Sequence, residues 1–238
     1  MIKLEYMIDA GCAGRANQDA YWVKQGIFQG KQVVLAMVCD GVGGAEKGEV
    51  ASRKTIDYIV GGFWSNLPDF LQKDLSMKQM GDKMDQYLQK ANRYLYRASC
   101  SNGIRTGTTI ALYFMLDRKY LIVNVGDSRV YWLKEKGMYR TRDHTLYERR
   151  RHGGMAPEKE KHILWQSVGS QTKVRADRYM GDVDQSMDVL LLTDGAYRPF
   201  SKQEIREYCQ YGNLNKMRRQ ALKRKEADNM AGVRIEIR

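Results

Sequence analysis

Val33-Val-Leu-Ala-Met-Val-Cys39 is an unbroken run of seven apolar residues, and Asp40-Gly-Val-Gly-Gly44 follows it directly. An apolar run of this length is typical of a strand that is buried on both faces. An aspartate beside such a strand costs free energy unless its charge is compensated or hydrogen-bonded. The glycine after it lets the backbone turn tightly, so that a carbonyl oxygen can point the same way as the carboxylate. The stretch therefore predicts a covered sheet that holds an acidic group at the end of a strand.

Four more acids stand at the edges of strand-like runs, namely Asp19, Asp127, Asp194 and Asp228. Asp194, for example, directly follows Val189-Leu-Leu-Leu-Thr193 and precedes Gly195. Taken alone, each Asp-Gly pair is explained as well by a common turn dipeptide. Several carboxylates that converge would repel one another, and divalent cations are the usual remedy. Together the five acids predict a site for divalent metal ions.

The rest of the sequence predicts helices in two blocks, with antiparallel strands before, between and after them. The predicted strands are 20–25, 32–40, 108–116, 120–125, 130–133, 138–141, 187–193 and 232–237. Helices are predicted over 49–67 and over 68–99, the latter divided at Gly81. Another begins at Ser201, where Glu204 completes a capping-box pattern. This order favours an α+β fold over a doubly wound parallel sheet.

Length, composition and cysteine spacing indicate a globular intracellular protein. The chain has 238 residues, 43% of them hydrophobic, and no Ser/Gly/Pro-rich linker divides it, so we expect one domain over 1–238. The longest apolar runs are far shorter than the roughly 20 residues that cross a bilayer, and the N-terminus lacks an apolar secretion signal. The four cysteines are widely separated, which favours reduced thiols. We expect a soluble cytoplasmic protein that does not associate with membranes.

The positive charge is concentrated in two clusters. The chain carries 40 Lys+Arg against 28 Asp+Glu, a formal net charge of +12. One cluster is 149–151, and the other, 216–225, has Met217, Ala221 and Leu222 at the spacing of a surface helix with one apolar stripe. Nucleic-acid binding is one explanation, and salt-sensitive DNA retention would favour it. No zinc finger, helix-turn-helix pattern or RNP-like aromatic motif accompanies the second cluster, so we expect a solvated surface or a docking patch for an acidic or phosphorylated partner.

A series of short motifs spans nearly the whole chain in a fixed order. They are Arg15-Ala-Asn-Gln-Asp19, Asp40-Gly-Val-Gly-Gly44 with Gly48-Glu-Val-Ala-Ser52, Gly107-Thr-Thr109, Val125-Gly-Asp127-Ser-Arg129-Val-Tyr131, Thr141-Arg-Asp143-His144, Leu191-Leu-Thr-Asp194-Gly195 and Asp228-Asn229. Each motif is weak alone. The ordered set resembles the metal-dependent protein phosphatases of the PP2C (PPM) family, bacterial type.

This resemblance implies a fold and an activity. The fold would be a central β-sandwich of two antiparallel sheets flanked by helices on both sides. The activity would be hydrolysis of phosphoserine and phosphothreonine in proteins, the substrates of a serine/threonine kinase, by a monomeric enzyme. A water activated by a binuclear Mg²⁺ or Mn²⁺ centre would attack phosphorus without a phospho-enzyme intermediate.

The resemblance also implies roles for individual residues. Asp40 would bridge both metals, and the Gly41 carbonyl would bind one of them. Asp194 and Asp228 would hold the other metal, and Asp127 together with Asp194 would bind a third, weaker one.

Two further assignments follow from the first motif. Asp19 would orient metal-bound water, which makes Asp19, Asp40 and Asp194 the expected catalytic residues. Arg15 would bind the substrate phosphate, but it lies three residues before Gln18, whereas the family's arginine commonly lies four before, so its role stays open.

The sequence departs from the family pattern elsewhere as well. No histidine follows Asp40-Gly41, where animal and plant members place a general acid, and His144 is more simply a structural residue. Segment 147–162, with Gly153-Gly154, would form a basic flap over the site. A catalytically inactive phosphoprotein-binding regulator is the main alternative, although retention of the acids argues against it.

Overall fold

A computed structural model describes residues 1–42, 47–103, 106–134, 137–151 and 157–238. Gly43-Gly44 and Gly153-Gly154, singled out in the sequence, lie outside the described residues. The described part contains two five-stranded sheets in which every pair of neighbouring strands is antiparallel. This architecture confirms the predicted α+β sandwich.

The first sheet joins the two ends of the chain. Its order is β1-β12-β11-β8-β9. The strands are β1 (Ile2–Asp9), β12 (Met230–Ile237), β11 (Met187–Leu192), β8 (Arg129–Lys134) and β9 (Gly137–Arg140).

The second sheet contains the long apolar run, and its order is β10-β7-β6-β3-β2. The strands are β10 (Asp177–Asp182), β7 (Lys119–Val125), β6 (Ile110–Leu116), β3 (Lys31–Cys39) and β2 (Ala20–Phe28). A short ladder of β4 (Gly41–Val42) and β5 (Gly107–Thr108) extends beyond β3 and β6.

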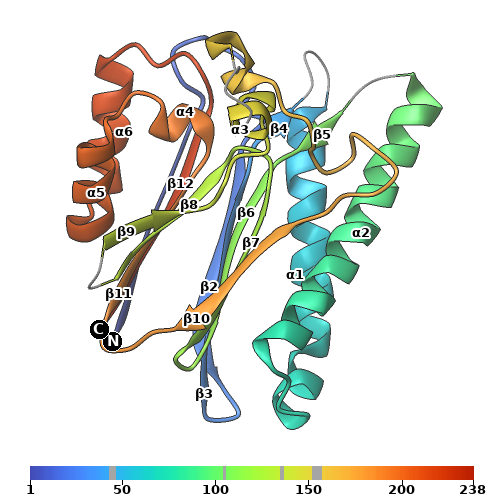
Figure 1. Ribbon diagram of the computed structural model, residues 1–238, viewed down its shortest axis with the longest axis vertical. Coiled ribbons are helices and arrows are strands. Elements are labelled where there is room, and N and C mark those ends of the chain that lie inside the picture. The colour runs from blue at the N-terminus through green and yellow to red at the C-terminus, as the bar shows by residue number, and fades with distance from the viewer. Residues whose placement is uncertain (43–46, 104–105, 135–136, 152–156) are drawn as a thin grey trace.

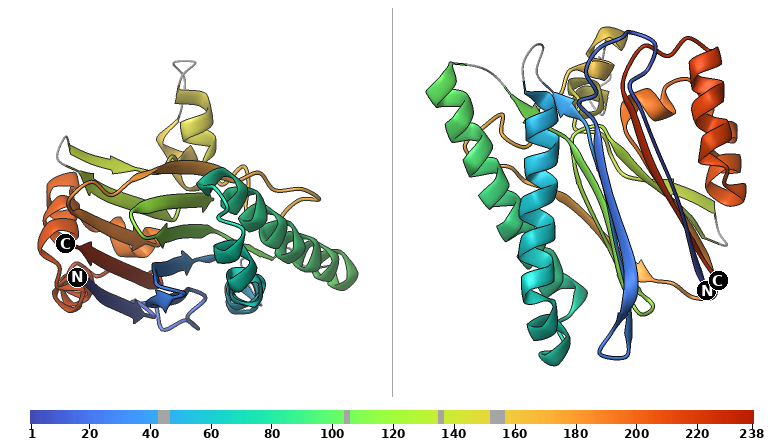
Figure 2. Two further views of the ribbon diagram at one scale, coloured as in Figure 1. Left: turned by 90° about the horizontal axis from the view of Figure 1, so that it is seen from below. Right: turned by 180° about the vertical axis from the view of Figure 1, so that it is seen from behind.

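Helices cover the outer faces of both sheets (Figures 1 and 2). Helices α1 (Gly48–Gln72) and α2 (Met77–Asn102) pack on the second sheet, and α5 (Lys202–Tyr211) and α6 (Leu214–Lys223) pack on the first. Short elements lie at the end of the sandwich opposite the two termini. They are α3 (Leu146–Arg150), the 3₁₀ helix Glu158–His162 and α4 (Asp194–Tyr197).

Strand β3 is buried on both faces, as its apolar run predicts. Val33, Leu35 and Met37 pack toward α1 and α2, whereas Val34 and Ala36 pack into the core between the two sheets. Because both faces are covered, the strand is fixed in register and direction. Its C-terminal end is therefore a rigid place from which to present Asp40.

The helix boundaries differ from the prediction at two points. Helix α1 continues through Pro68 to Gln72, because Leu67, Phe70 and Leu71 extend its buried face. The division predicted at Gly81 is wrong.

The break instead lies before Ser76, which caps α2 in a capping box with Gln79. A Cβ on Gly81 would lie 2.9 Å from Arg178 Nη1, and that arginine pairs with Asp82 and Asp85 on the same helix. A glycine at position 81 is therefore explained by the Arg178 side chain that passes close to it. Gly81 does not mark a helix break.

The basic clusters are partly neutralised by acids of the same chain. Arg150 pairs with Glu160 at 2.6 Å, and Arg218 of α6 pairs with Asp9 at 2.7 Å. Helix α6 buries Met217 and Ala221, which confirms the predicted apolar stripe. None of the helices in the described ranges is long and apolar enough to span a bilayer.

Candidate metal centre

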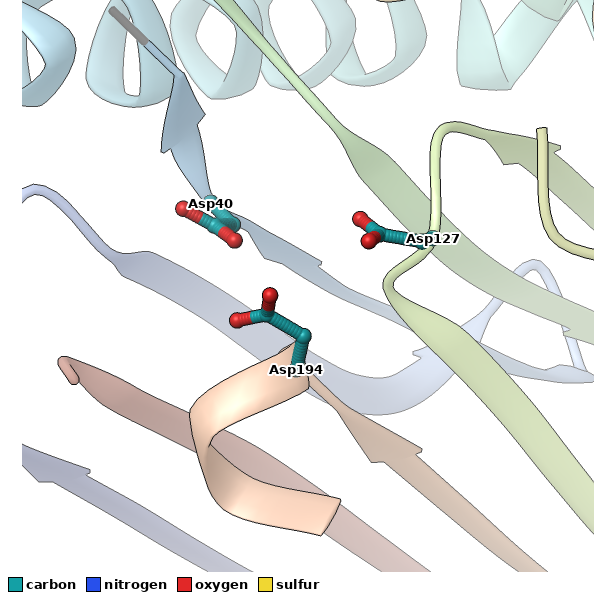
Figure 3. A group of neighbouring side chains, drawn as sticks. All are labelled: Asp40, Asp127 and Asp194. Carbon is teal, nitrogen blue, oxygen red and sulfur yellow. The ribbon is translucent and has the colours of Figure 1, made fainter. Parts of the chain in front are cut away.

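Three of the predicted acids meet at one end of the sandwich (Figure 3). Asp40 follows β3, Asp127 lies between β7 and β8, and Asp194 begins α4. One carboxylate oxygen from each lies within 4.8 Å of the others. Three separate parts of the sequence thus offer oxygen ligands at a separation that one or two cations can bridge.

Burial and mutual repulsion raise the pKa of the carboxyl groups in this cluster. Burial, opposed by a hydrogen bond from Thr193 and reinforced by Asp194, raises the pKa of Asp19 to about 8. Burial and the charge of Asp194 raise the pKa of Asp127 to about 8. Burial and then Asp19 and Asp194 raise the pKa of Asp40 well above its usual value. A cluster of this kind is stabilised by added positive charge.

Asp40 is held through its backbone by the Gly107-Thr-Thr109 motif. Its N–H donates to Thr109 Oγ1 at 2.9 Å, and its carbonyl accepts from Thr108 Oγ1 at 2.8 Å and from the Thr109 N–H at 2.9 Å. Thr109 Oγ1 also lies 2.6 Å from Ser128 Oγ, next to Asp127. The two threonines therefore tie the Asp40 segment to the Asp127 segment.

Asp127 is positioned by its neighbours along the chain and across the end of the sheet. Gly126 has a φ of +95°, and its carbonyl accepts from the His144 N–H at 2.9 Å. The Asp127 carbonyl accepts from the Tyr197 hydroxyl at 3.1 Å. His144 itself is buried, and its Nδ1 lies 2.8 Å from Gln166 Nε2. These contacts support the structural role predicted for His144.

Asp19 reaches the cluster through Thr193. The Thr193 hydroxyl donates to Asp19 Oδ2 at 2.6 Å and accepts from the Ala231 N–H at 2.8 Å. Thr193 is fully buried and directly precedes Asp194. Asp19 is thus fixed to the strand end that carries Asp194, although the two are far apart in sequence.

Backbone segments approach so closely at this site that side chains are excluded. A Cβ on Gly41 would lie 2.3 Å from the Gly48 carbonyl oxygen. A Cβ on Gly48 would lie 2.6 Å from Gln18 Oε1 and 2.9 Å from the Gly41 carbonyl oxygen. Likewise, a Cβ on Gly195 would lie 2.2 Å from the Asn229 carbonyl oxygen. The glycines of the motifs therefore let the four acidic segments come together.

Replacing Gly41 by Ala should destabilise the protein by about 1–3 kcal/mol, the usual cost of forcing extra volume into a packed site. Gly61→Ala is the matched control, because Gly61 lies on α1 with nothing within 4 Å of a Cβ. That control should gain about 0.5–1 kcal/mol from the better helix former. Urea unfolding of the two variants measures the difference, and equal stabilities would contradict the proposed close approach.

Asp228 joins the cluster through an arginine that the sequence reasoning missed. Arg198 Nη1 lies 3.1 Å from Asp228 Oδ2, and Arg198 Nη2 pairs with Asp194 Oδ2. Burial disfavours the charge on Arg198, but Asp194, Tyr197 and Asp228 more than offset this, so its pKa is raised. The side chain of Asp228 is 51% exposed and that of Asp194 only 8%, so Asp228 lies at the open rim of the site.

The predicted phosphate-binding residue is not joined to the acids. Arg15 is exposed between β1 and β2, and within the described ranges no hydrogen bond or ion pair involves it. In the predicted flap, Arg151 pairs with Glu148 at 3.3 Å, and Arg149 lies 5.5 Å from the centre of the Trp165 ring. The structure thus leaves the role of Arg15 as a prediction.

The donor set fits a hard divalent cation. Carboxylate oxygens from Asp40, Asp127 and Asp194 converge, and such oxygens are the ligands that Mg²⁺ and Mn²⁺ prefer. Burial and the charges of neighbouring acids raise the pKa of Asp40 and Asp127, an effect that added positive charge would offset. A profile of the family described as protein phosphatase 2C matches residues 12–230.

The chain belongs to the protein phosphatase 2C family.

A curated relative agrees with this membership, and two solved structures share the fold. The serine/threonine phosphatase stp of Listeria innocua serovar 6a is 28% identical over 213 residues, which cover 85% of this chain and 81% of the relative. The serine/threonine phosphatase of S. agalactiae superposes with a TM-score of 0.81 at 22% identity and covers all of both chains. The catalytic domain of the phosphatase PstP, solved with two manganese ions, has a TM-score of 0.81 at 21% identity, covering 100% of this chain and 99% of that one.

Within this phosphatase, burial makes Cys39 a poor nucleophile. Cys39 is fully buried beside Asp40, and burial together with Asp19 and Asp40 raises the pKa of its thiol. A thiol that stays protonated is a poor nucleophile. All four cysteines of the phosphatase have free thiols, in agreement with the sequence.

Proposed function

We propose that this protein phosphatase hydrolyses phosphoserine and phosphothreonine in phosphoproteins at a centre of two divalent cations, Mn²⁺ or Mg²⁺. The observation that carries the proposal is the convergence of Asp40, Asp127 and Asp194 within 4.8 Å at the open end of the sandwich. The solved PstP domain, which contains two manganese ions, supports the same choice of cofactor.

The proposed ligands come from four segments. Asp40 and the Gly41 carbonyl would hold one cation, and Asp40, Asp194 and Asp228 would hold the other. Asp127 with Asp194 would offer a third, weaker position. When bound, the cations would lower the pKa of a water molecule and offset the negative charge that develops on the transferring phosphoryl group.

The chain's own residues would then position the reacting groups. Asp19 would accept a hydrogen bond from the attacking water through the carboxylate oxygen that Thr193 leaves free, since Thr193 donates to Oδ2 alone. The hydrogen bond from Thr193 fixes Oδ2 of Asp19, which would favour a defined position for the attacking water. Cys39 is buried and its pKa is raised, so it would not serve as the nucleophile. We assign Asp19, Asp40 and Asp194 as the catalytic residues, and Arg15 keeps its proposed role toward the substrate phosphate.

We infer that residues 1–238 work as one phosphatase domain and as a cytoplasmic monomer. Strand β1 pairs with β12 along its whole length, which joins the two ends of the chain in one sheet. The free thiols of all four cysteines suit a reducing compartment.

Phosphate release from peptides tests the proposal. With Mn²⁺ the wild type should dephosphorylate phosphothreonine and phosphoserine peptides, and a chelator should abolish the activity because the carboxylates alone cannot activate water. A phosphotyrosine peptide of the same sequence serves as the matched comparison and should be cleaved at a much lower rate.

Two results would overturn the proposal. Activity that survives removal of all divalent cations would exclude the metal mechanism. A folded protein that binds Mn²⁺ and phosphopeptides but releases no phosphate would instead support the inactive phosphoprotein-binding regulator.

A further inference from the structure

Arg198 places a positive charge directly on two of the proposed metal ligands. Its guanidinium bridges the site, because Nη1 lies 3.1 Å from Asp228 Oδ2 and Nη2 pairs with Asp194 Oδ2. Arg198 follows Asp194 by one helical turn, and its N–H donates to the Asp194 carbonyl at 2.9 Å. This spacing puts the two side chains on the same face of the short helix.

The arginine therefore competes with a cation for Oδ2 of Asp194 and Oδ2 of Asp228. Only Oδ1 of each acid is left by the guanidinium, and Asp228 Oδ1 already accepts from the Asn229 N–H at 3.0 Å. A divalent ion beside an unmoved guanidinium would also meet its positive charge in a largely buried place. A cation that binds Oδ2 of these two acids therefore has to displace Arg198.

The surroundings give Arg198 room to leave. Its side chain is 30% exposed, and it lines a cavity of about 390 Å³ together with Arg129, Asp143 and Tyr197. Arg129 is already fixed in this cavity by its pairing with Asp143 at 2.6 Å and by the Tyr197 ring 3.7 Å away. Arg198 differs from Arg129 in that its own partners are the proposed metal ligands.

We propose that Arg198 is a built-in counter-ion of the metal centre: it neutralises Asp194 and Asp228 in the metal-free protein, and a divalent cation displaces it toward the cavity. This inference rests on the proposed function, since it takes both acids as metal ligands. Its consequence is that metal binding is weaker than the acids alone would give, and that the metal-free fold tolerates its buried charges better.

Isothermal titration with Mn²⁺ tests the competition directly. Arg198→Gln should tighten Mn²⁺ binding about tenfold. The loss of one hydrogen bond to a charged group changes a binding constant by about this factor. Arg198→Lys keeps the charge and should stay close to the wild type. Arg178→Gln is the matched control, since Arg178 also pairs with two aspartates, Asp82 and Asp85, far from the acids in sequence.

Thermal unfolding supplies a second measurement that does not depend on activity. In chelator, Arg198→Gln should unfold at a lower temperature than the wild type, because it leaves a buried carboxylate uncompensated. In saturating Mn²⁺ the difference should shrink or reverse. A residue with a merely structural role would lower the unfolding temperature equally in both conditions.

The outcomes separate this inference from the proposed function. If wild type and Arg198→Gln bind Mn²⁺ equally well, the counter-ion role is wrong and the metal centre stands. If Arg198→Gln binds more weakly, the arginine supports the metal instead of competing with it, and the inference is also overturned. If neither protein binds Mn²⁺, the proposed centre fails and the inference fails with it.

Discussion

Replacing Asp40 by Asn should lower kcat for phosphopeptide hydrolysis about a thousandfold or more, at the upper end of what loss of one electrostatic contact costs at an active site. The substitution removes one negative charge from the residue proposed to bridge both cations. It keeps the shape of the side chain and the backbone hydrogen bonds to Thr108 and Thr109. The loss should therefore reflect chemistry and not a collapsed site.

Steady-state kinetics with a phosphothreonine peptide and Mn²⁺ gives the measurement. Asp57→Asn, which removes a charge from an exposed position of α1, should retain wild-type kcat. Circular dichroism should show that the Asp40→Asn protein is folded. A folded variant that keeps more than a tenth of the wild-type kcat would speak against Asp40 as a bridging ligand.

Saturation with Mn²⁺ should raise the unfolding temperature by about 5–10 °C. A ligand at one hundred times its Kd stabilises the native state by about 2.7 kcal/mol. For a domain of this size each kcal/mol corresponds to about 2–4 °C. The metal-free fold keeps several carboxyl groups close together against their mutual repulsion. Bound cations would reduce this repulsion and so stabilise the native state.

Differential scanning calorimetry with and without Mn²⁺ measures this shift. Asp194→Asn should lose most of it, because Asp194 contributes to more than one proposed position. Asp69→Asn on the exposed face of α1 should keep the full shift. An equal shift in the wild type and in Asp194→Asn would mean that Mn²⁺ binds elsewhere.

The sequence predicted best those parts of the fold that are buried on both sides. The run that forms β3 has no polar residue to disturb the pattern, and the structure places its alternate residues in two separate cores. Long apolar runs also located β6, β7 and β11. In such strands burial alone decides the secondary structure, so a local pattern is enough.

Two edge strands, β1 and β10, escaped prediction for the opposite reason, whereas the edge strands β2 and β9 were predicted. Strand β1 (Ile2–Asp9) alternates imperfectly and lies at the edge of its sheet, where one side of it has no partner strand. Strand β10 (Asp177–Asp182) is also an edge strand, and none of its residues is buried. Their pairing is decided by distant strands, β12 and β7, which no local window contains.

The acids of the site were predictable, but their supporting contacts were not. Each aspartate follows or precedes an apolar run and can therefore be recognised in the sequence. Arg198 gave no such signal, because a single arginine after a strand is an ordinary surface residue until its distant neighbours are known. Its spacing of four residues from Asp194 could have pointed to an ion pair on one helix face.

The position of β12 determines when the centre can be assembled during folding. β12 lies between β1 and β11, so β1 joins the first sheet only when β12 is in place. Asp228 and Asn229 directly precede β12, and Asn229 Oδ1 accepts from the Gln18 N–H at 2.8 Å. A chain in which β12 is not yet paired therefore has its acids but lacks the strand that brings the first motif and the last together. Pairing of β12 with its two neighbours would be the folding step that completes the centre.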